Sequence, residues 1–424
     1  MTARLDAPWL RQGPLADLLS VLDRDGEQAR VVGGAVRNAL LGQMDGDAAP
    51  GDFDIATTAV PDEVTRRAVA AGFRVLPTGI AHGTVTVLVR GRPFEVTTLR
   101  RDVETDGRHA VVAFGRDWRA DAERRDFTMN ALSLGRDGTV HDPVGGLADL
   151  NARRVRFIGD PHARIVEDVL RVLRFFRFHA IYGEGAPDAE GLAASIAARD
   201  ALARLSRERV RAEMVKLLVA PRAAEVLGVM SDAGLLQRIL GGVAWLGAFS
   251  RMTMLEALLR QQPDAPRRLG VLAAIVPDDA ARLAERLRLS RDERTRIAAM
   301  ADGWWHVGPG LTEPAARAML YRLGKDIYRD RVLMAWAHAA AAADDAAWAR
   351  LADLPLRWSP PPLPFSAADF MARGIEKGPS LGKAMRCAET AWIAADFPAA
   401  VDIIAALIDT VAAASSPAGA RAGR

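Results

Sequence analysis

Cysteine and histidine are scarce in this chain, and their scarcity excludes several kinds of site. Cys387 is the only cysteine in 424 residues, so neither an intramolecular disulfide nor a cysteine-ligated zinc site can form. The seven histidines are scattered and supply no ligand set for a metal-dependent phosphohydrolase around His141 and Asp142. We therefore interpret His141-Asp142 as part of a structural turn.

Long apolar runs are also absent. No stretch of 18 apolar residues occurs in the sequence, so no membrane-spanning helix is predicted. Residues 1–19 lack the basic segment and apolar core of a signal peptide. Together with the single cysteine, which agrees with a reducing compartment, these features predict a cytoplasmic protein with no membrane partner. They leave the oligomeric state open.

Lysine is rare, whereas arginine is frequent. A net charge of +3 and a sequence pI of about 9.3 permit a polyanionic partner without requiring one. Arginine suits bidentate contacts to phosphates and base edges, although richness in Ala and Arg more often reflects genome composition. The lysines are Lys216, Lys325, Lys377 and Lys383.

The chain divides into a part with strand signals and a part without them. At 424 residues it is too long for one compact core, and two to four domains are expected. Up to about residue 140, short β-rich runs alternate with helical ones, which predicts an α/β or α+β domain with a small mixed sheet. The predicted strands cover 29–32, 53–58, 84–89, 93–100 and 109–114, with a hairpin turn at 90–92 and a helix over 61–72.

From about residue 160 onward the apolar residues follow the helical period. Residues 161–183 predict one long amphipathic helix that begins after Pro161. The proline-rich residues 359–370 predict a rigid linker or loop. The second part of the chain is therefore predicted to be all-α.

Residues 29–42 read ARVVGGAVRNALLG, which predicts a strand, a Gly-Gly turn and a helix. Backbone N–H groups at the start of a helix can bind phosphate, and Gly33 and Gly34 allow a close approach of the backbone. Arg37, one turn into the helix, can reach the same anion. Such a turn is structural at least as often as it binds phosphate, and it matches neither a P-loop nor a dinucleotide fingerprint.

Asp52 and Asp54 flank Phe53 in the next predicted strand. Residues i and i+2 of a strand share a face, so two like charges lie together there, which is unfavourable without a cation. A divalent metal that bridges phosphate oxygens would supply the cation; a solvated acidic turn is the alternative. Glu95, on the strand at 93–100, is a candidate third carboxylate or an ordinary exposed residue. The Gly-Gly turn followed by the two aspartates resembles the nucleotidyltransferases of the polymerase-β superfamily.

Two later segments carry arginines next to aspartates. Residues 124–132 read RRDFTMNAL, in which Arg125 can form a local ion pair or face a triphosphate. Residues 167–178 read EDVLRVLRFFRF, and a continuous helix would place Asp168, Arg171 and Arg174 on one face. A salt-bridged helix face is the common explanation. A fixed Asp–Arg pair could also meet the donor and acceptor edge of a nucleobase.

In combination these segments resemble the bacterial tRNA nucleotidyltransferase and poly(A) polymerase family, specifically the class II CCA-adding enzymes. The resemblance covers roughly residues 29–215 and rests on several ordered motifs. It implies an α+β fold: a polymerase-β-like head with a small mixed sheet, followed by an all-α neck, body and tail. The expected divisions are a head at 1–140, a neck at 141–220, a body at 221–355 and a tail at 356–424. The motifs are GGAVRNALLG, DFDIATTA, TGIAHGTVTV, FEVTTLRRD, DGRHAVVAF, RRDFTMNAL, DPVGGLADL, EDVLRVLRFFRF and LSRERVRAE.

The resemblance also implies roles for individual residues. Asp52 and Asp54 would hold Mg²⁺, and Glu95 would be the third carboxylate. Residues 100–110 match the family's flexible loop, which is thought to help switch selection from C to A. The triphosphate and nucleotide contacts would come from Gly33, Gly34, Arg37 and Arg125, and the base contacts from Asp168 and Arg171, with Arg174 and Arg177 lining the site. The family usually has Asp where Asn38 stands, so the role of that side chain is in doubt.

The implied reaction is attack of a tRNA 3′-hydroxyl on the α-phosphate of CTP or ATP with release of pyrophosphate. A poly(A) polymerase or an A-adding enzyme shares the same head and base-reading segment, and is the alternative within the family. A catalytically silent RNA-binding protein is disfavoured because both aspartates and the Asp168–Arg171 pair are present. The tRNA would lie along the arginine-bearing helical part, where basic stretches are more often solvated helix faces.

Overall fold

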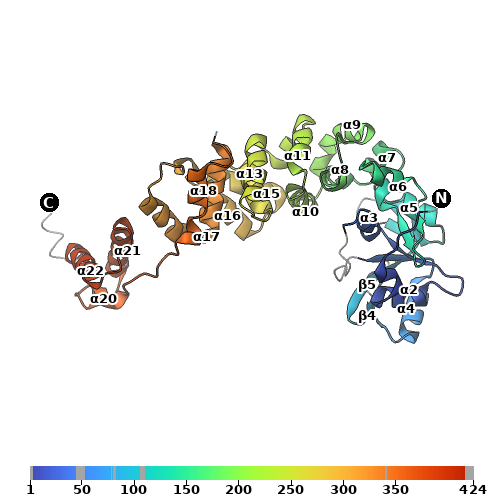
Figure 1. Ribbon diagram of the computed structural model, residues 1–424, viewed down its shortest axis with the longest axis horizontal. Helices are drawn as coiled ribbons and strands as arrows, with labels where there is room; N and C mark the ends of the chain where they lie inside the picture. The colour runs from blue at the N-terminus through green and yellow to red at the C-terminus, as the bar shows by residue number, and fades with distance from the viewer. Residues whose placement is uncertain are drawn as a thin grey trace. The chain divides into compact units, whose positions relative to one another are not determined.

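The computed structural model describes residues 3–43, 53–77, 79, 83–105, 110–339 and 341–415. The chain forms two compact units, unit 1 at Met1–Gly242 and unit 2 at Val243–Arg424. In Figure 1 unit 1 runs from blue to green and unit 2 continues to red. The finer division into head, neck, body and tail stays a prediction.

Unit 1 contains a seven-stranded mixed sheet with the strand order β3-β4-β5-β2-β1-β8-β9. Within it, β2 and β5 pair in parallel, and the remaining pairs are antiparallel. A separate two-stranded sheet joins β6 and β7. This architecture confirms the small mixed sheet predicted from the sequence. The strands are β1 (Ala29–Val32), β2 (Asp54–Thr57), β3 (Arg74–Leu76), β4 (Thr84–Val89), β5 (Arg92–Thr98), β6 (Arg100–Thr105), β7 (Ala110–Phe114), β8 (Ser133–Gly135) and β9 (Val140–His141).

The hairpin between β4 and β5 shows how local sequence sets this geometry. Residues along β4 alternate between buried and half-buried, as expected for a strand with one face in the core. Arg90 and Gly91 both have positive φ values, 50° and 79°. Positive φ at both central residues matches the right-handed twist of the paired strands, so the predicted hairpin is confirmed.

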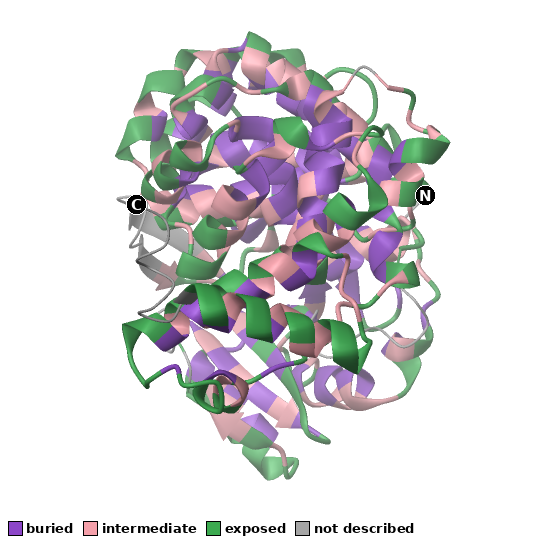
Figure 2. Ribbon diagram, turned by 90° about the vertical axis from the view of Figure 1, so that its left-hand side faces the viewer, coloured by how far each residue is buried: buried purple, intermediate pink, exposed green. Residues whose placement is uncertain are grey.

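Helices cover both faces of the sheet. The helices α2 (Pro14–Leu22) and α4 (Pro61–Ala70) pack against each other and against β4, as seen in Figure 1. On the other face, Trp118 of α5 (Trp118–Glu123) packs against Val32, Ala56 and Leu99. Figure 2 shows buried residues on the strands and on the inward faces of the helices. The α5 face is the one that carries the candidate site.

After β9 the described residues of unit 1 form helices and no further named strand. The predicted single helix over 161–183 is wrong, because α7 (Pro161–Glu167) ends before Asp168 and α8 (Leu170–Tyr182) begins after it. At Asp168 the backbone is extended, with φ −150° and ψ 106°. The other helices are α1 (Pro8–Arg11), α3 (Gly34–Leu40), α6 (Gly146–Asn151), α9 (Ala189–Ala197), α10 (Arg207–Leu218), α11 (Ala223–Asp232) and α12 (Leu235–Leu240), with 3₁₀ turns at Thr128–Asn130 and Arg199–Arg204.

Unit 2 is helical throughout its described residues. Its core holds a buried ion network in which Arg267 donates to Asp330 at 2.7 Å and to Glu256 at 3.0 Å. A separate apolar cluster around Phe370 and Trp392 holds the last three helices together.

None of the helices in the described ranges of the chain is long and apolar enough to cross a membrane. The helices are α13 (Leu246–Leu258), α14 (Ala265–Ala273), α15 (Pro277–Leu287), α16 (Arg291–Ala301), α17 (Glu313–His338, kinked at Gly324), α18 (Ala346–Ala352), α19 (Leu354–Arg357), α20 (Ala367–Met371), α21 (Pro379–Ala394) and α22 (Val401–Ser415), with a 3₁₀ turn at Trp304–His306.

Candidate active site

Asp54 and Glu95 lie side by side at one end of the sheet. Asp54 is the first residue of β2, and the parallel pairing of β2 with β5 places it opposite Glu95. Both residues are exposed. Neighbouring strands are about 4.8 Å apart, so the two carboxylates can share one cation. Asp52 lies outside the described residues, and the structure therefore places only one member of the predicted aspartate pair.

Gly33 brings the Gly-Gly turn to the same place. Its backbone has φ 72° and ψ −131°, and it precedes α3 directly. A Cβ atom at Gly33 would lie 3.5 Å from Nη1 of Arg125 and 4.0 Å from Oδ2 of Asp54. Glycine is favoured here both by the positive φ and by the close approach of these two side chains. Three predicted site residues that are distant in sequence thus meet around one turn.

Asp121 holds Arg125 in this position, and the sequence analysis missed it. The Oδ2 atom of Asp121 accepts a hydrogen bond from Nη2 of Arg125 at 3.1 Å, and its Oδ1 atom accepts one from Nε of Arg124 at 2.9 Å. Asp121 is 3% exposed, so its charge requires these partners. The spacing of three and four residues to the two arginines that directly follow α5 is the signal that could have identified it.

Arg37 is more buried than the sequence suggested. Its guanidinium donates to Oδ1 of Asn130 at 2.5 Å, to the hydroxyl of Tyr182 at 2.6 Å and to Oδ1 of Asn38 at 3.1 Å. It also lies 3.8 Å from the ring centroid of Tyr182, and burial lowers its pKa. The nearest heavy atom to a Cβ built at Gly34 is Nη2 of Arg37, at 3.5 Å. Direct contact of Arg37 with a phosphate stays a prediction.

Asp168 stands at the junction of two helices instead of on one continuous helix face. Its Oδ1 atom accepts from the backbone N–H of Leu170 at 3.0 Å, which caps the start of α8. Its Oδ2 atom accepts from Nη2 of Arg209 on α10 at 2.7 Å. Arg171 pairs with Glu167, whose Oε2 accepts from Nη1 at 2.5 Å. Asp168 and Arg171 are thus not paired with each other: Asp168 pairs with Arg209, and Arg171 pairs with Glu167.

Arg174 and Arg177 project from α8 toward buried carboxylates. The Oδ2 atom of Asp126 accepts from Nε of Arg174 at 2.8 Å, and Oε2 of Glu213 accepts from Nε of Arg177 at 2.5 Å. Burial opposes ionisation of Asp126, but the charge of Arg174 and hydrogen bonds from Asn130 and Arg174 lower its pKa. Asp126 also accepts from Nδ2 of Asn130 at 2.9 Å. The bond from Arg174 to Asp126 links α8 to the RRDFTMNAL segment.

Comparison with known proteins finds similarity to poly(A) polymerases and tRNA nucleotidyltransferases. Residues 29–156 match the poly A polymerase head domain, and residues 187–246 match the probable RNA and SrmB-binding site of polymerase A. The mitochondrial CCA tRNA nucleotidyltransferase 1 of Danio rerio is 40% identical over 285 residues, which cover 66% of this chain and 64% of that protein. Over these segments the chain is similar to tRNA nucleotidyltransferases and poly(A) polymerases. The CCA-adding enzyme of Geobacillus thermodenitrificans is 41% identical over 237 residues, covering 55% of this chain and 56% of the relative.

Solved structures of the tRNA nucleotidyltransferase family extend the likeness to nearly the whole chain. The Bacillus stearothermophilus CCA-adding enzyme in complex with CTP superposes with a TM-score of 0.72 and 25% identity, covering 96% of this chain and 98% of that one. The Thermotoga maritima enzyme complexed with tRNA_CCA has a TM-score of 0.70 at 17% identity, with coverages of 97% and 99%, and shares the fold. By sequence, the chain spans 64% of the length of the Danio rerio relative and 56% of the length of the Geobacillus thermodenitrificans relative. The expected polymerase-β-like head followed by helices is confirmed.

The likeness to nucleotidyltransferases implies the use of a divalent metal. The donor set at the end of β2 fits such an ion, because carboxylate oxygens are the ligands that hard divalent cations prefer. The family's usual Asp is replaced by Asn38, whose Oδ1 accepts from both Nε and Nη2 of Arg37 at 3.1 Å. The amide oxygen of Asn38 therefore accepts hydrogen bonds from Arg37, but because the amide is uncharged the two side chains form no ion pair.

The segment expected to match the family's flexible loop forms a two-stranded ribbon. Residues of β6 pair with β7 in antiparallel register, with an irregularity between Asp102 and Glu104. The base of the ribbon is tied to the sheet, because the N–H of Leu99 donates to the carbonyl of Thr57 in β2 at 2.8 Å, and the N–H of Gly115 donates to the carbonyl of Leu99 at 2.8 Å. Residues 106–109 lie outside the described part of the chain. Any role in nucleotide switching stays a prediction.

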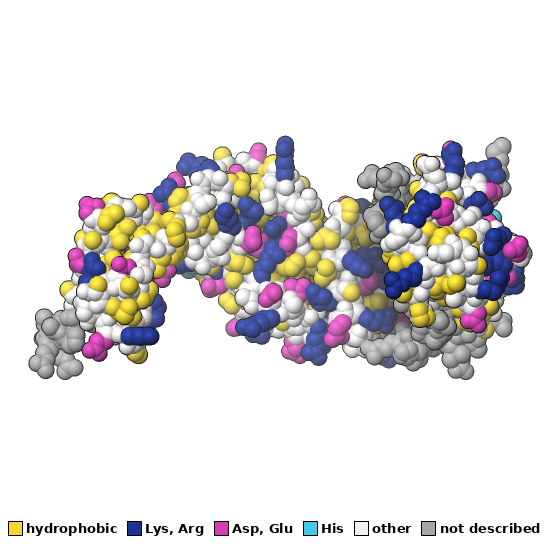
Figure 3. Space-filling view, turned by 90° about the horizontal axis from the view of Figure 1, so that it is seen from below, with side chains coloured by type: hydrophobic (Ala, Val, Ile, Leu, Met, Phe, Trp, Pro, Cys, Tyr) yellow, Lys and Arg dark blue, Asp and Glu magenta, His cyan; other side chains and the backbone are white. Residues whose placement is uncertain are grey.

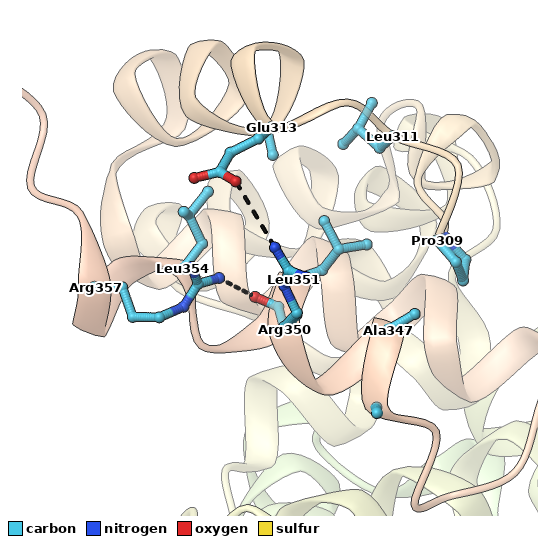
Figure 4. A pocket seen from close by; sticks show the side chains of 10 residues that line it. Pro309, Leu311, Glu313, Ala347, Arg350, Leu351, Leu354 and Arg357 are labelled. Carbon is cyan, nitrogen blue, oxygen red and sulfur yellow. Dashed lines mark hydrogen bonds and ion pairs between the residues drawn. The ribbon is translucent and has the colours of Figure 1, made fainter.

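Unit 2 contains a cavity of about 410 Å³ whose lining includes none of the predicted site residues (Figure 4). Its apolar wall includes Leu311, Leu351 and Leu354. Its charged side chains are already engaged: Oε2 of Glu313 lies 3.9 Å from Nη2 of Arg350, and Arg357 donates to the carbonyl of Arg350 at 2.7 Å. The residues predicted from sequence to form the site all belong to unit 1.

Proposed function

We propose that this protein adds the 3′-terminal CCA to tRNA by template-independent, Mg²⁺-dependent transfer of nucleotides from CTP and ATP. The observation that carries the proposal is the meeting of Asp54, Glu95 and Arg125 around the Gly33 turn. Acidic side chains for a metal and a guanidinium for phosphate oxygens are the groups that nucleotidyl transfer requires. The assignment of individual roles follows from this placement.

Mg²⁺ would be held by Asp54 with Asp52, and by Glu95 as a third carboxylate, and would supply charge stabilisation at the reacting phosphorus. Gly33 and Gly34 leave space for the triphosphate to approach the backbone. Arg125, fixed by Asp121, would neutralise charge on the pyrophosphate leaving group as the bond from the α- to the β-phosphate breaks. Arg37 would stabilise the Gly33–Gly34 turn through its buried hydrogen bonds to Asn130 and Tyr182.

Base selection is proposed to come from the junction of α7 and α8. The carboxylate of Asp168 can accept a hydrogen bond from the exocyclic amino group that cytosine and adenine share, and Arg171 can donate to the adjacent ring nitrogen. Uracil and guanine present the opposite pattern at these positions, so the same pair would reject them. Arg174 and Arg177 would line the nucleotide site next to this pair.

The tRNA is proposed to bind mainly through its backbone phosphates along the helical part of the chain. On the face shown in Figure 3, basic and acidic side chains are interspersed instead of forming one basic stripe. We therefore assign no single arginine to tRNA binding. Cytoplasmic location also remains a proposal.

Nucleotide incorporation into defined tRNA transcripts tests this function. Transcripts that end before, within and after CCA are each incubated with Mg²⁺ and either CTP or ATP. We expect CTP alone to add two residues to the shortest transcript, and ATP to extend only transcripts that end in CC. Processive incorporation of ATP without CTP would establish a poly(A) polymerase instead.

The carboxylates are tested in the same assay with Asp54→Asn and Asp52→Ala. Loss of one metal ligand is expected to reduce incorporation by at least about 100-fold, comparable to losing a key electrostatic group in other active sites. Because Asp54 is exposed, the circular dichroism spectrum should remain that of the wild type. Activity that survives both substitutions would refute the metal assignment.

A further inference from the structure

A second cavity, about 390 Å³ in volume, lies next to the candidate active site in unit 1. It sits on the face of the sheet that α5 covers, and its lining includes Arg30, Trp118, Arg125, Ser133, His141 and Asp142. Arg125 belongs to both places, because its guanidinium also reaches the Gly33 turn. Val32, the residue before Gly33, lines the cavity as well. The cavity and the site of phosphate transfer are therefore neighbours.

Arg30 is held in this cavity by neutral partners. Its Nη2 atom donates to Oε1 of Gln28 at 2.9 Å, and the same oxygen accepts from Nε1 of Trp118 at 2.8 Å. The guanidinium carbon lies 4.0 Å from the ring centroid of Trp118. Within the described residues no carboxylate is hydrogen-bonded to Arg30, so its charge is oriented but not neutralised by a direct contact.

The two carboxylates that line the cavity already have partners. Both oxygens of Asp121 accept from arginines, Arg124 and Arg125. Both oxygens of Asp142 accept from backbone N–H groups at the start of α6, those of Gly146 and Leu147, at 2.7 and 2.9 Å. The oxygens of these two carboxylates are thus engaged by other donors. Asp23 and Asp137 act on the charge of Arg30 but do not line the cavity, so Arg30 and Arg125 can meet an anion there.

Gly135 lets the backbone of β8 lie close to Asp137 and His141. It lies opposite Arg30 in the register of β1 with β8. A Cβ atom at Gly135 would lie 3.5 Å from Nε2 of His141 and 2.8 Å from Oδ1 of Asp137. Burial and the charge of Arg30 lower the pKa of His141, while Asp137 opposes the change. Near neutral pH the imidazole is therefore uncharged and can report on an anion bound next to it.

We propose that this cavity is a phosphate subsite that receives the inorganic pyrophosphate released at the adjacent active site. Arg125 contacts the leaving group in the proposed function, and the half-buried Arg30 lines the same cavity without a hydrogen-bonded carboxylate among the described residues, whereas the exposed Arg119 is paired with Glu123. A guanidinium fork suits the paired oxygens of a phosphate group. The source of the pyrophosphate rests on the proposed function, whereas the binding of the anion does not.

Titration of the full-length protein with pyrophosphate, in the absence of metal and tRNA, tests the subsite. The pKa of His141 is followed by the NMR signals of its ring protons, which are assigned by their loss in His141→Asn. A bound polyanion is expected to raise this pKa by about one unit. In Arg30→Gln the apparent Kd for pyrophosphate should be at least about tenfold weaker, because a charge-assisted hydrogen bond is lost.

Two further variants separate binding from folding. Arg74→Gln changes an exposed arginine on β3, at the opposite end of the sheet, and should bind pyrophosphate as the wild type does. Arg30→Lys keeps the charge without the fork, and should bind with an affinity between those of the wild type and Arg30→Gln. This variant keeps the test decisive if Arg30→Gln does not fold.

Several outcomes would overturn the subsite. These are an unchanged His141 signal at saturating pyrophosphate, equal affinity in the wild type and Arg30→Gln, or a His141 shift produced by a tRNA transcript but not by pyrophosphate. The last would show that the cavity binds an RNA phosphate. If pyrophosphate binds as expected but no nucleotide is incorporated into tRNA, the subsite stands and the proposed function fails.

Discussion

Several charged side chains in unit 1 form ion pairs that connect distant segments of the chain, and Asp126 is the clearest case. It is 8% exposed, accepts from Arg174, Asn130 and the backbone of Phe127, and joins two segments that are about 50 residues apart. A buried carboxylate with a complete set of donors is stabilising only while it is ionised. Its role is therefore sensitive both to substitution and to acid.

Asp126→Asn is expected to lower the free energy of unfolding of unit 1 by about 2 to 3 kcal/mol, because Arg174 loses its charged partner. The pKa of Asp126 is lowered in the fold, so its contribution is present above the ordinary carboxyl pKa of about 3.9. The contribution is lost as the pH falls through the lowered value. The variant should therefore lose less stability than the wild type between pH 5 and about pH 3.

Urea unfolding followed by circular dichroism at several pH values measures both effects. Asp25→Asn is a suitable control, because Asp25 is exposed and its ion pair with Arg24, at 3.6 Å, lies at the surface. Asparagine also tolerates its positive φ of 53°. This control should unfold like the wild type. Equal stability of Asp126→Asn and the wild type at pH 7 would contradict the linking role.

At the scale of elements, the break between α7 and α8 is where the proposed base selection would take place. Asp168 both caps α8 and faces Arg209, so its backbone is fixed by the helix start and its second oxygen by α10. A residue within a continuous helix would have no such cap to make. The break therefore orients one carboxylate from two directions.

Substitutions at Asp168 should separate capping from base selection. Asn retains an oxygen that caps α8, so Asp168→Asn should change the free energy of unfolding by no more than about 0.5 kcal/mol. It loses the charged acceptor, and incorporation of CTP and ATP should fall by about 10- to 100-fold with weaker discrimination against UTP. Asp168→Ala should show the same kinetic defect and lose about 1 kcal/mol of stability as well. Unaltered discrimination in both variants would contradict the assignment.

Local patterns predicted the elements of unit 1 well, because alternation along residues 84–89 and the Gly-Gly turn are properties of neighbouring residues. The break at Asp168 was missed, since the apolar period continues across it without a proline or glycine. The pairing of Asp54 with Glu95 depends on parallel strands 41 residues apart, for which no local signal exists. The burial of Arg37 under Tyr182, 145 residues away, was equally invisible in the sequence.

The chain forms two compact units, and we expect them to have different tasks. Every residue that the sequence assigned to the site lies in unit 1, whereas unit 2 has its own buried ion network around Arg267 and Asp330. Separate cores are typical of parts that can fold independently. The two units are therefore expected to contribute nucleotide chemistry and RNA binding separately.

A fragment that ends at Gly242 tests this division. It should fold, and CTP should raise its melting temperature as much as that of the full chain, because a ligand that binds only the folded state stabilises it by mass action. Extension of tRNA should be lost or strongly weakened, since the helices of unit 2 are missing. A folded fragment that extends tRNA at the rate of the full chain would contradict the proposed role of unit 2.

The most direct test of the central claim is the sequence of the product. A tRNA transcript without CCA is incubated with the protein, Mg²⁺ and all four nucleoside triphosphates, and the new 3′ ends are sequenced. The proposed active site predicts a uniform CCA end, with no further additions and no U or G. An unextended transcript, or a tail of several A residues without the two C residues, would contradict it.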